Sequence, residues 1–100
     1  MTRKLAPIHP GEVLIEDFLK PLGVTQYRIA KAIRVPQRRI SEIVQGKRGI
    51  TADTALRFGR FFGMEAEFWI NLQAHHDLEV ARDALDAKLK RDVTPLVRAA

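Results

Sequence analysis

The sequence predicts an all-α domain of five helices, or six if the last helical stretch is broken. Three observations lead to this fold class. Apolar residues recur at helical spacing between prolines and glycines that punctuate the chain. No segment alternates apolar and polar residues as a half-buried strand would. The chain has 100 residues, of which 46% are apolar and 29% charged, and this size and composition suit one domain with one core.

Capping residues, prolines and glycines set the expected helix boundaries. We expect helices at about 10–20, 25–33, 36–45, 51–62 and from 65 to about 90. Thr25 and Thr51 are good N-caps, because a threonine hydroxyl accepts a hydrogen bond from the first helical turn. Pro21 is expected to end the first helix, and Gly46 to end the third in the left-handed conformation. Leu56 is expected on the core face of the fourth helix.

Several classes of protein are disfavoured by what the sequence lacks. No run of 18 apolar residues predicts a membrane span, and the first 30 residues do not read as a signal peptide. Cysteine is absent, which removes disulfides, thiolate nucleophiles and Cys-ligated zinc and fits a reducing cytoplasm. A small hydrolase is disfavoured because Ser41 is the only serine and no histidine is near it in sequence.

Neither a metal site nor a cofactor is expected. His75 and His76 are followed by Asp77, but neighbours on a helix point about 100° apart and do not share a face. No complete ligand set is visible, so these residues are interpreted as polar surface. His9 precedes Pro10 and is interpreted as a helix-entry residue.

The charge is polarised along the chain. Residues 1–50 carry ten Lys or Arg and four Asp or Glu, whereas residues 51–100 carry seven and eight. Seven basic residues and one acid lie between Thr25 and Arg48, and six acids and one base lie between Met64 and Asp86. This asymmetry favours two binding faces, one of them for a polyanion, although a merely solvated surface would give a similar count.

The stretch from Gln26 to Gln45 has the spacing of a helix-turn-helix. Only Arg34, Val35 and Pro36 separate its two helices, and such a short join forces them to cross steeply. In this unit the second helix enters the major groove of DNA and its N-terminal residues meet base edges. Side chains suited to base or phosphate contact occur at the exposed positions. The predicted DNA-binding residues are Gln26, Gln37, Arg38, Arg39, Ser41, Glu42, Lys47 and Arg48.

Each of these residue types has a matching partner on DNA. Arginine pairs with guanine, glutamine with adenine, and a carboxylate such as Glu42 accepts from cytosine N4. Gln26 opens the first helix of the unit and is placed to meet a phosphate, as are Lys47 and Arg48 just past the second helix. A plain helical hairpin with a basic surface is the alternative.

Five motifs together resemble the HigA antitoxins, also known as VapI-like addiction-module antidotes, of the lambda-repressor-like (XRE) helix-turn-helix superfamily. They are HPGE (9–12), PLGV (21–24), RISEIVQGKR (39–48), GITADTAL (49–56) and FWINLQ (68–73). The resemblance covers about residues 9–79. It implies a lambda-repressor-like single domain over 1–100, with its core at about 9–79, its helix-turn-helix at about 26–45 and a C-terminal helical extension at about 80–94.

The resemblance also implies a function. Members of this family are homodimeric, cytoplasmic bacterial antitoxins that bind a HigB toxin, a RelE-like mRNA interferase, and repress their own operon at a palindrome in double-stranded DNA. It implies no enzyme activity and no cofactor. The alternatives are a free-standing XRE-type repressor without a toxin partner and a protein-interaction module that does not bind DNA.

Two departures from the family pattern concern local geometry. The superfamily often has glycine in the turn between the two helices, where this chain has Arg34. A residue other than glycine costs about 1 kcal/mol at a positive φ. The family often starts its fifth helix with a small capping residue and a proline, where this chain has Met64-Glu65-Ala66.

Two further surfaces are expected outside the DNA-binding face. Exposed apolar residues of the C-terminal half are candidates for the dimer interface: Trp69, Ile70, Leu78, Leu85 and Leu89. Family toxins are usually basic, so acidic residues away from the DNA face are candidates for the toxin interface. These are Glu12, Glu16, Asp17, Asp77 and Glu79. The alternative role for these acids is to keep a basic protein soluble.

Overall fold

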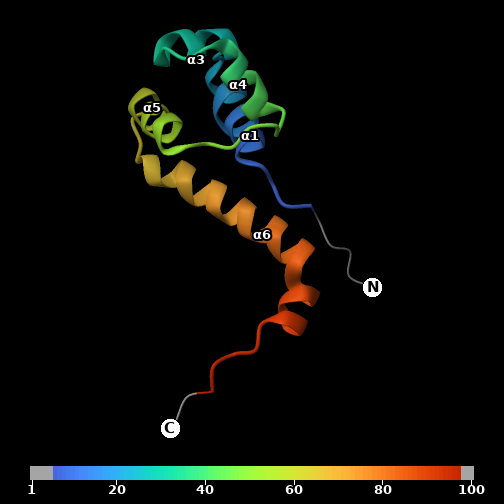
Figure 1. The fold of residues 1–100 in the computed structure, drawn as a ribbon. Coiled ribbons are helices and arrows are strands. Elements are labelled where there is room, and N and C mark those ends of the chain that lie inside the picture. The colour runs from blue at the N-terminus through green and yellow to red at the C-terminus, as the bar shows by residue number, and fades with distance from the viewer. Residues whose placement is uncertain (1–5, 98–100) are drawn as a thin grey trace.

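The computed structural model describes residues 6–97 and confirms the all-α fold, with five helices and no strand in that range (Figure 1). The first helix consists of α1 (Pro10–Val13), a π-helical stretch η1 (Leu14–Leu19) and α2 (Lys20–Leu22). The other four are α3 (Gln26–Ile33), α4 (Gln37–Val44), α5 (Ala52–Phe62) and α6 (Ala66–Asp92). The last helix is unbroken, so the fold has five helices and not six.

The expectation that Pro21 ends the first helix is wrong. The helix passes Pro21 and ends at Gly23, which takes the left-handed conformation with φ +65°. In an α-helix a proline ring clashes with the carbonyl group four residues earlier. Here the preceding residues form π turns, in which the N–H of Lys20 bonds to the carbonyl of Ile15 five residues back. The wider π turn changes the spacing that produces the clash.

The predicted caps are confirmed. The Thr25 hydroxyl accepts a hydrogen bond from the N–H of Arg28 at 3.0 Å, and Thr51 accepts one from the N–H of Thr54 at 3.4 Å. His9 is the helix-entry residue that its position indicates, since its Nδ1 accepts from the N–H of Gly11 at 2.9 Å. These side chains satisfy N–H groups that have no partner within their own helix.

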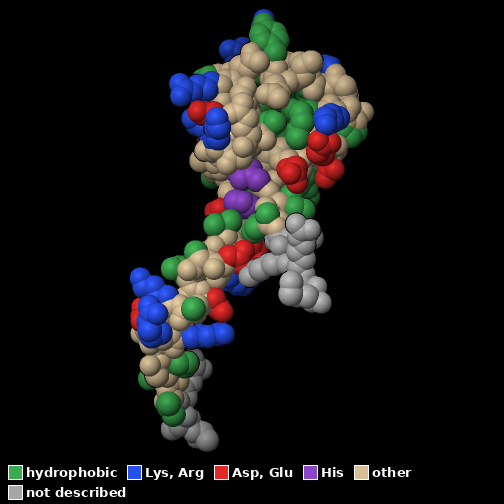
Figure 2. Space-filling view, turned by 90° about the vertical axis from the view of Figure 1, so that its right-hand side faces the viewer, with side chains coloured by type: hydrophobic (Ala, Val, Ile, Leu, Met, Phe, Trp, Pro, Cys, Tyr) green, Lys and Arg blue, Asp and Glu red, His purple; other side chains and the backbone are tan. Residues whose placement is uncertain are grey.

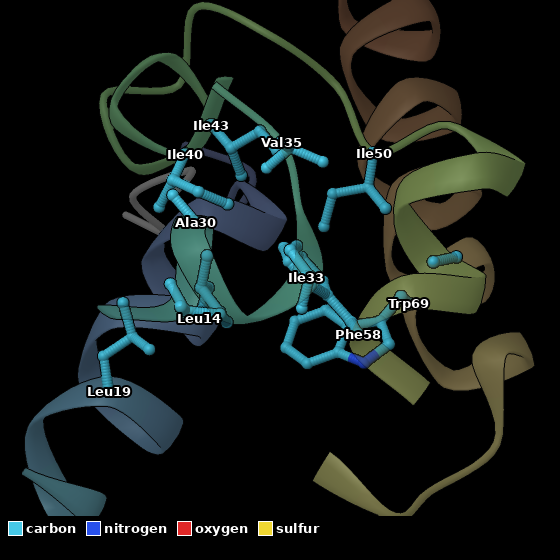
Figure 3. Packing of buried hydrophobic residues seen from close by; sticks show 12 residues of the cluster. Leu14, Leu19, Ala30, Ile33, Val35, Ile40, Ile43, Ile50, Phe58 and Trp69 are labelled. Atoms are coloured by element: carbon cyan, nitrogen blue, oxygen red, sulfur yellow. The ribbon is translucent and has the colours of Figure 1, made fainter. Parts of the chain in front are cut away.

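The core is formed by apolar side chains from all five helices, together with Val35 and Ile50 from the connecting segments (Figure 3). Its members are Leu14, Leu19, Ile29, Ala30, Ile33, Val35, Ile40, Ile43, Ile50, Ala55, Phe58 and Trp69. Leu56 was expected among them, but it is 65% exposed. The inward positions of α5 are Ala55, Phe58 and Gly59, and Leu56 lies about 100° around the helix from Ala55.

Trp69 is a correction to the expected dimer interface. Its side chain is fully buried within the chain's own core, where its ring lies 5.0 Å from that of Phe58 and 4.9 Å from that of Phe18. Because no part of Trp69 reaches the surface, it cannot contact a second copy of the chain in this conformation. The sequence placed it among exposed residues because periodicity does not tell which flank of an apolar helix meets the core.

Helix α6 extends beyond the rest of the fold (Figure 1). Its first turns pack against α5 and α1, but every residue from 80 to 97 is exposed. Although α6 has 27 residues, no helix within residues 6–97 is both long and apolar enough to cross a membrane.

Arg34 is the only residue other than glycine with a positive φ in the part of the chain that the structure describes, with φ +60° and ψ +50°. We expect Arg34→Gly to raise stability by about 0.5–1 kcal/mol, because it removes left-handed strain but increases the entropy of the unfolded chain. Thermal unfolding should show a rise in Tm of several degrees.

Arg34→Ala is the matched control for this measurement. It removes the guanidinium but retains the Cβ that causes the strain, so Tm should not rise. An equal rise in both variants would show that the Arg34 side chain, and not its backbone conformation, limits stability.

Candidate nucleic-acid interface

Helices α3 and α4 form the helix-turn-helix that the spacing predicts. Ala30 in the middle of α3 is 2% exposed, and Ile40 and Ile43 on α4 are fully buried. A small residue at position 30 allows the two helices to approach closely, and Val35 fills the turn between them. The opposite face of α4 is therefore the one that remains outside.

The polar side chains at the start of α4 face outward to different extents. Gln37 and Arg38 are exposed, whereas Arg39, Ser41 and Glu42 are half-buried. The Ser41 hydroxyl donates to the side-chain oxygen of Gln26 at 3.2 Å, which joins the first residue of α3 to the outer face of α4. This bond uses the amide oxygen of Gln26 and leaves its NH₂ group as a donor.

Glu42 lies between two arginines. Its Oε2 accepts from Arg38 Nε at 3.2 Å, and its Oε1 lies 2.8 Å from Arg48 Nη2. Hydrogen bonds from Arg48 and then from Arg38 hold the pKa of Glu42 below its usual range, so the carboxylate stays charged. The backbone carbonyl of Glu42 also accepts from the N–H groups of Lys47 and Arg48, which closes the turn after α4.

A second network ties α4 to α5 and α3. Arg39 Nη1 lies 3.2 Å from Asp53 Oδ1, and Arg57 Nε donates to the same oxygen at 2.8 Å. Arg57 also donates to the backbone carbonyl of Ile33 at 2.7 Å, at the C-terminal end of α3. The hydrogen bond from Arg57, with a smaller one from Arg39, lowers the pKa of Asp53. Arg39 is thus held in place by another helix, while Arg38 remains 84% exposed.

Basic side chains surround a small hollow beside the start of α4. The hollow has a volume of about 200 Å³ and is lined by Pro36, Arg38, Arg39 and Arg48. Figure 2 shows Lys and Arg side chains on the folded part of the molecule and again near the end of α6. A second hollow, between α3 and α5, is also lined by basic side chains, those of Arg34, Arg57 and Arg60.

Two histidines meet where the start of the first helix, the turn after α4 and α6 come together. The rings of His9 and His76 meet edge to face at 4.8 Å, where α6 leaves the folded part (Figure 2). Burial, together with the nearby His76, lowers the pKa of His9, so its ring stays neutral and keeps its Nδ1 as the cap acceptor. No group of three or more metal-binding side chains is assembled within residues 6–97.

Four of the five residues expected at the dimer interface share one face of α6. Ile70, Leu78, Leu85 and Leu89 are 36–54% exposed and fall within about 100° of arc. Trp69 points to the opposite side, about 180° from Leu78.

The acids expected at a toxin interface divide between two elements. Glu12, Glu16 and Asp17 lie exposed on the first helix, and Asp77 and Glu79 lie on α6. Three of them already have partners: Glu16 with Lys20 at 2.7 Å, Asp77 with Gln73 at 2.9 Å and Glu79 with Arg82 at 2.6 Å. Glu12 on the first helix and Asp77 on α6 both lie near His9, so the two sets of acids approach each other there.

Sequence reasoning missed three residues that support the site. Asp53 and Arg57 have the i, i+4 spacing of a helical ion pair, a signal that the sequence did offer. Gln73 had no such signal: its side-chain oxygen accepts from the N–H of Ile50 at 2.7 Å and ties the loop before α5 to α6.

Comparison with known proteins decides the family. The helix-turn-helix family model matches residues 15–69, which include α3, α4 and α5. The chain belongs to the helix-turn-helix family. It is 51% identical over 78 residues to virulence-associated protein I of Dichelobacter nodosus, an alignment that covers 78% of this chain and 72% of that protein.

Two solved structures extend the similarity to most of the helix-turn-helix chain. One is Pseudomonas aeruginosa antitoxin HigA with the higBA promoter, at 38% identity and a TM-score of 0.88, over 91% of this chain and 99% of that one. The other is an addiction-module antidote protein of the HigA family from Coxiella burnetii, at 41% identity and a TM-score of 0.86, over 92% and 100%. The resemblance to HigA antitoxins that the motifs indicated is confirmed.

Proposed function

We propose that this helix-turn-helix protein is an antitoxin that represses its own operon by binding a palindromic operator and neutralises a HigB-like mRNA interferase toxin. The observation that carries the DNA-binding half is the outer face of α4, where Gln37, Arg38 and Ser41 project from a helix fixed by two fully buried isoleucines. The similar Pseudomonas aeruginosa antitoxin HigA was solved with the higBA promoter, which supports this assignment. Such a protein acts by occupying its partners and needs no catalysis.

The contacts with DNA divide into readout and anchoring. We assign base readout to Gln37, Arg38 and Ser41 on the outer face of α4, with Glu42 beside them. Phosphate contacts are assigned to Gln26, Arg39, Lys47 and Arg48, which surround that helix. These two classes respond differently to mutation, because phosphate contacts carry no sequence information.

Two variants separate the classes. Arg38→Ala should cost about 1–3 kcal/mol on the operator and relax the preference at one base pair, whereas Lys47→Ala should weaken binding to all sequences alike. The salt dependence should also flatten by about one unit of slope in Lys47→Ala. Titration of a duplex taken from upstream of the coding sequence, against a shuffled duplex, measures both effects.

The assignment of α4 as the recognition helix depends on the first variant. Unchanged affinity and unchanged sequence preference in a folded Arg38→Ala protein would show that another element reads the bases. Circular dichroism provides the check on folding.

The dimer is proposed to form through the exposed stripe of α6. One domain of this size contacts few base pairs, so useful specificity requires two domains on two half-sites. Ile70, Leu78, Leu85 and Leu89 are exposed within about 100° of arc on α6, and the three leucines lie about 160–180° from Trp69. A second α6 is the partner whose own stripe matches it, as a two-fold contact requires.

Leu85→Glu should abolish this dimer, because it places a charge in the middle of the stripe. Val80→Glu is the matched control: Val80 is 46% exposed against 40% for Leu85, and it points about 140° away from it on the same helix. Sedimentation at micromolar concentration should show a monomer for Leu85→Glu and a dimer for Val80→Glu. A wild-type protein that sediments as a monomer without DNA or toxin contradicts the proposal.

The toxin is proposed to bind away from α4. A basic toxin would be repelled by the positive surface around the helix-turn-helix and steered toward acidic surface. The first helix offers Glu12, Glu16 and Asp17, and α6 offers Asp77 and Glu79. Both regions lie on elements other than α3 and α4, so DNA and toxin use different faces of the chain.

Charge reversals test whether the two faces are separate. Arg38→Glu should abolish operator binding and leave neutralisation of a co-expressed toxin intact. Glu16→Lys with Asp17→Lys, or Asp77→Lys with Glu79→Lys, should slow toxin association and spare DNA binding. Growth rescue and duplex titration are the two measurements.

The same experiment separates the antitoxin from a free-standing repressor. A folded, dimeric Arg38→Glu protein that no longer neutralises would show that toxin and operator compete for one helix. A neighbouring gene that encodes no growth-inhibiting protein neutralised by this chain would leave the free-standing repressor as the function.

A further inference from the structure

Glu42 is unusual among the residues of the outer face of α4, because it is acidic and both of its oxygens are engaged. One oxygen accepts from Arg38 and the other from Arg48, at 3.2 and 2.8 Å. It is the only acid between Thr25 and Arg48, a segment with seven basic residues. A carboxylate at this position faces the same surface that would meet DNA phosphates.

Stability does not account for these ion pairs. Arg38 is 84% exposed and Arg48 is 48% exposed, and pairs in such positions are weakened by water and salt. The turn after α4 is closed by the backbone carbonyl of Glu42, so it does not depend on the carboxylate. What the carboxylate does control is the position of two flexible guanidinium groups.

Glu42 and the phosphates of DNA compete for the same two guanidinium groups. A guanidinium that is paired with Glu42 must break or share that ion pair before it can bind a phosphate at an arbitrary position. Releasing Arg38 and Arg48 would add two mobile cations to the surface, and mobile cations bind any duplex. Held in place, the same groups lose less conformational freedom when a matching site presents acceptors where they already point.

We propose that Glu42 is a positioning residue that holds Arg38 and Arg48 as an internal counter-charge, which weakens binding to arbitrary DNA and thereby raises the preference for the operator. The inference rests on the proposed DNA-binding function and changes the role of this side chain. Glu42 acts through two arginines rather than by accepting from a base itself.

The test substitutes Glu42→Gln, which keeps the size of the side chain and removes its charge. The operator duplex is first obtained by selection from a random duplex library with the wild-type protein. Affinity for a shuffled duplex should rise in the variant, and its salt dependence should steepen by about one unit of slope. The ratio of operator to shuffled affinity should fall by roughly tenfold, the scale of ordering one or two long side chains.

Two further variants make the test specific. Glu67→Gln on α6 removes the same charge from an exposed position away from the site, and should leave the ratio unchanged. Arg48→Ala combined with Glu42→Gln completes a double-mutant cycle, in which removing Arg48 first should abolish most of the effect of Glu42→Gln. Circular dichroism confirms that each variant is folded.

Three results would overturn the inference. An effect of Glu42→Gln that persists in full without Arg48 and is confined to one base pair would identify Glu42 as a direct reader. An equal effect of Glu67→Gln would show that the change in operator preference comes from the net charge of the protein and not from the position of Glu42. A wild-type protein that selects no duplex would overturn the proposed function as well. If the wild-type protein does select a duplex, either of the first two results overturns this inference alone.

Discussion

The rotation of α4 about its own axis is the constraint on which the candidate site depends. Ile40 and Ile43 are fully buried, and a helix with two buried positions three residues apart has no freedom to turn. Residues 37, 38, 41 and 42 are then directed outward by helical geometry alone. Any change that moved the isoleucines would move all the polar side chains together. Packing in the core therefore determines which side chains can meet a ligand.

A close backbone contact supports this arrangement from below. A Cβ placed on Gly11 would lie 1.7 Å from the carbonyl oxygen of Ile43, so α1 approaches the end of α4 more closely than any other residue would allow. His9 caps α1 next to this contact and touches His76 of α6. The start of the first helix thus joins α4 to α6, the helix proposed to form the dimer. Rigid placement of one helix-turn-helix relative to the other on a palindrome requires a connection of this kind.

The helices and the outer face of α4 could be predicted from the sequence because their signals are local. Thr25 and Thr51 cap the next turn, and the spacing of Ile40 and Ile43 gives the inward face without knowledge of the partner helix. The failures are not local. Leu56 and Trp69 were assigned to the wrong sides of their helices because only the packed neighbours determine which flank of an apolar stretch is covered. Likewise, the pair between Arg39 and Asp53 joins residues 14 apart that lie on different helices.

Trp69 packs one flank of α6 into the core, while the other flank is exposed. The ring buries one flank of the helix among Phe18, Phe58, Phe62 and Phe68, with centroids 4.9–6.0 Å away. Its indole N–H is buried without a hydrogen-bond partner, which costs about 1–3 kcal/mol. The aromatic contacts and the large apolar area of the ring offset that cost. Trp69 thus anchors one flank of the first turns of α6, whereas Leu78 and Leu85 lie farther along the helix, where it leaves the core, and are exposed.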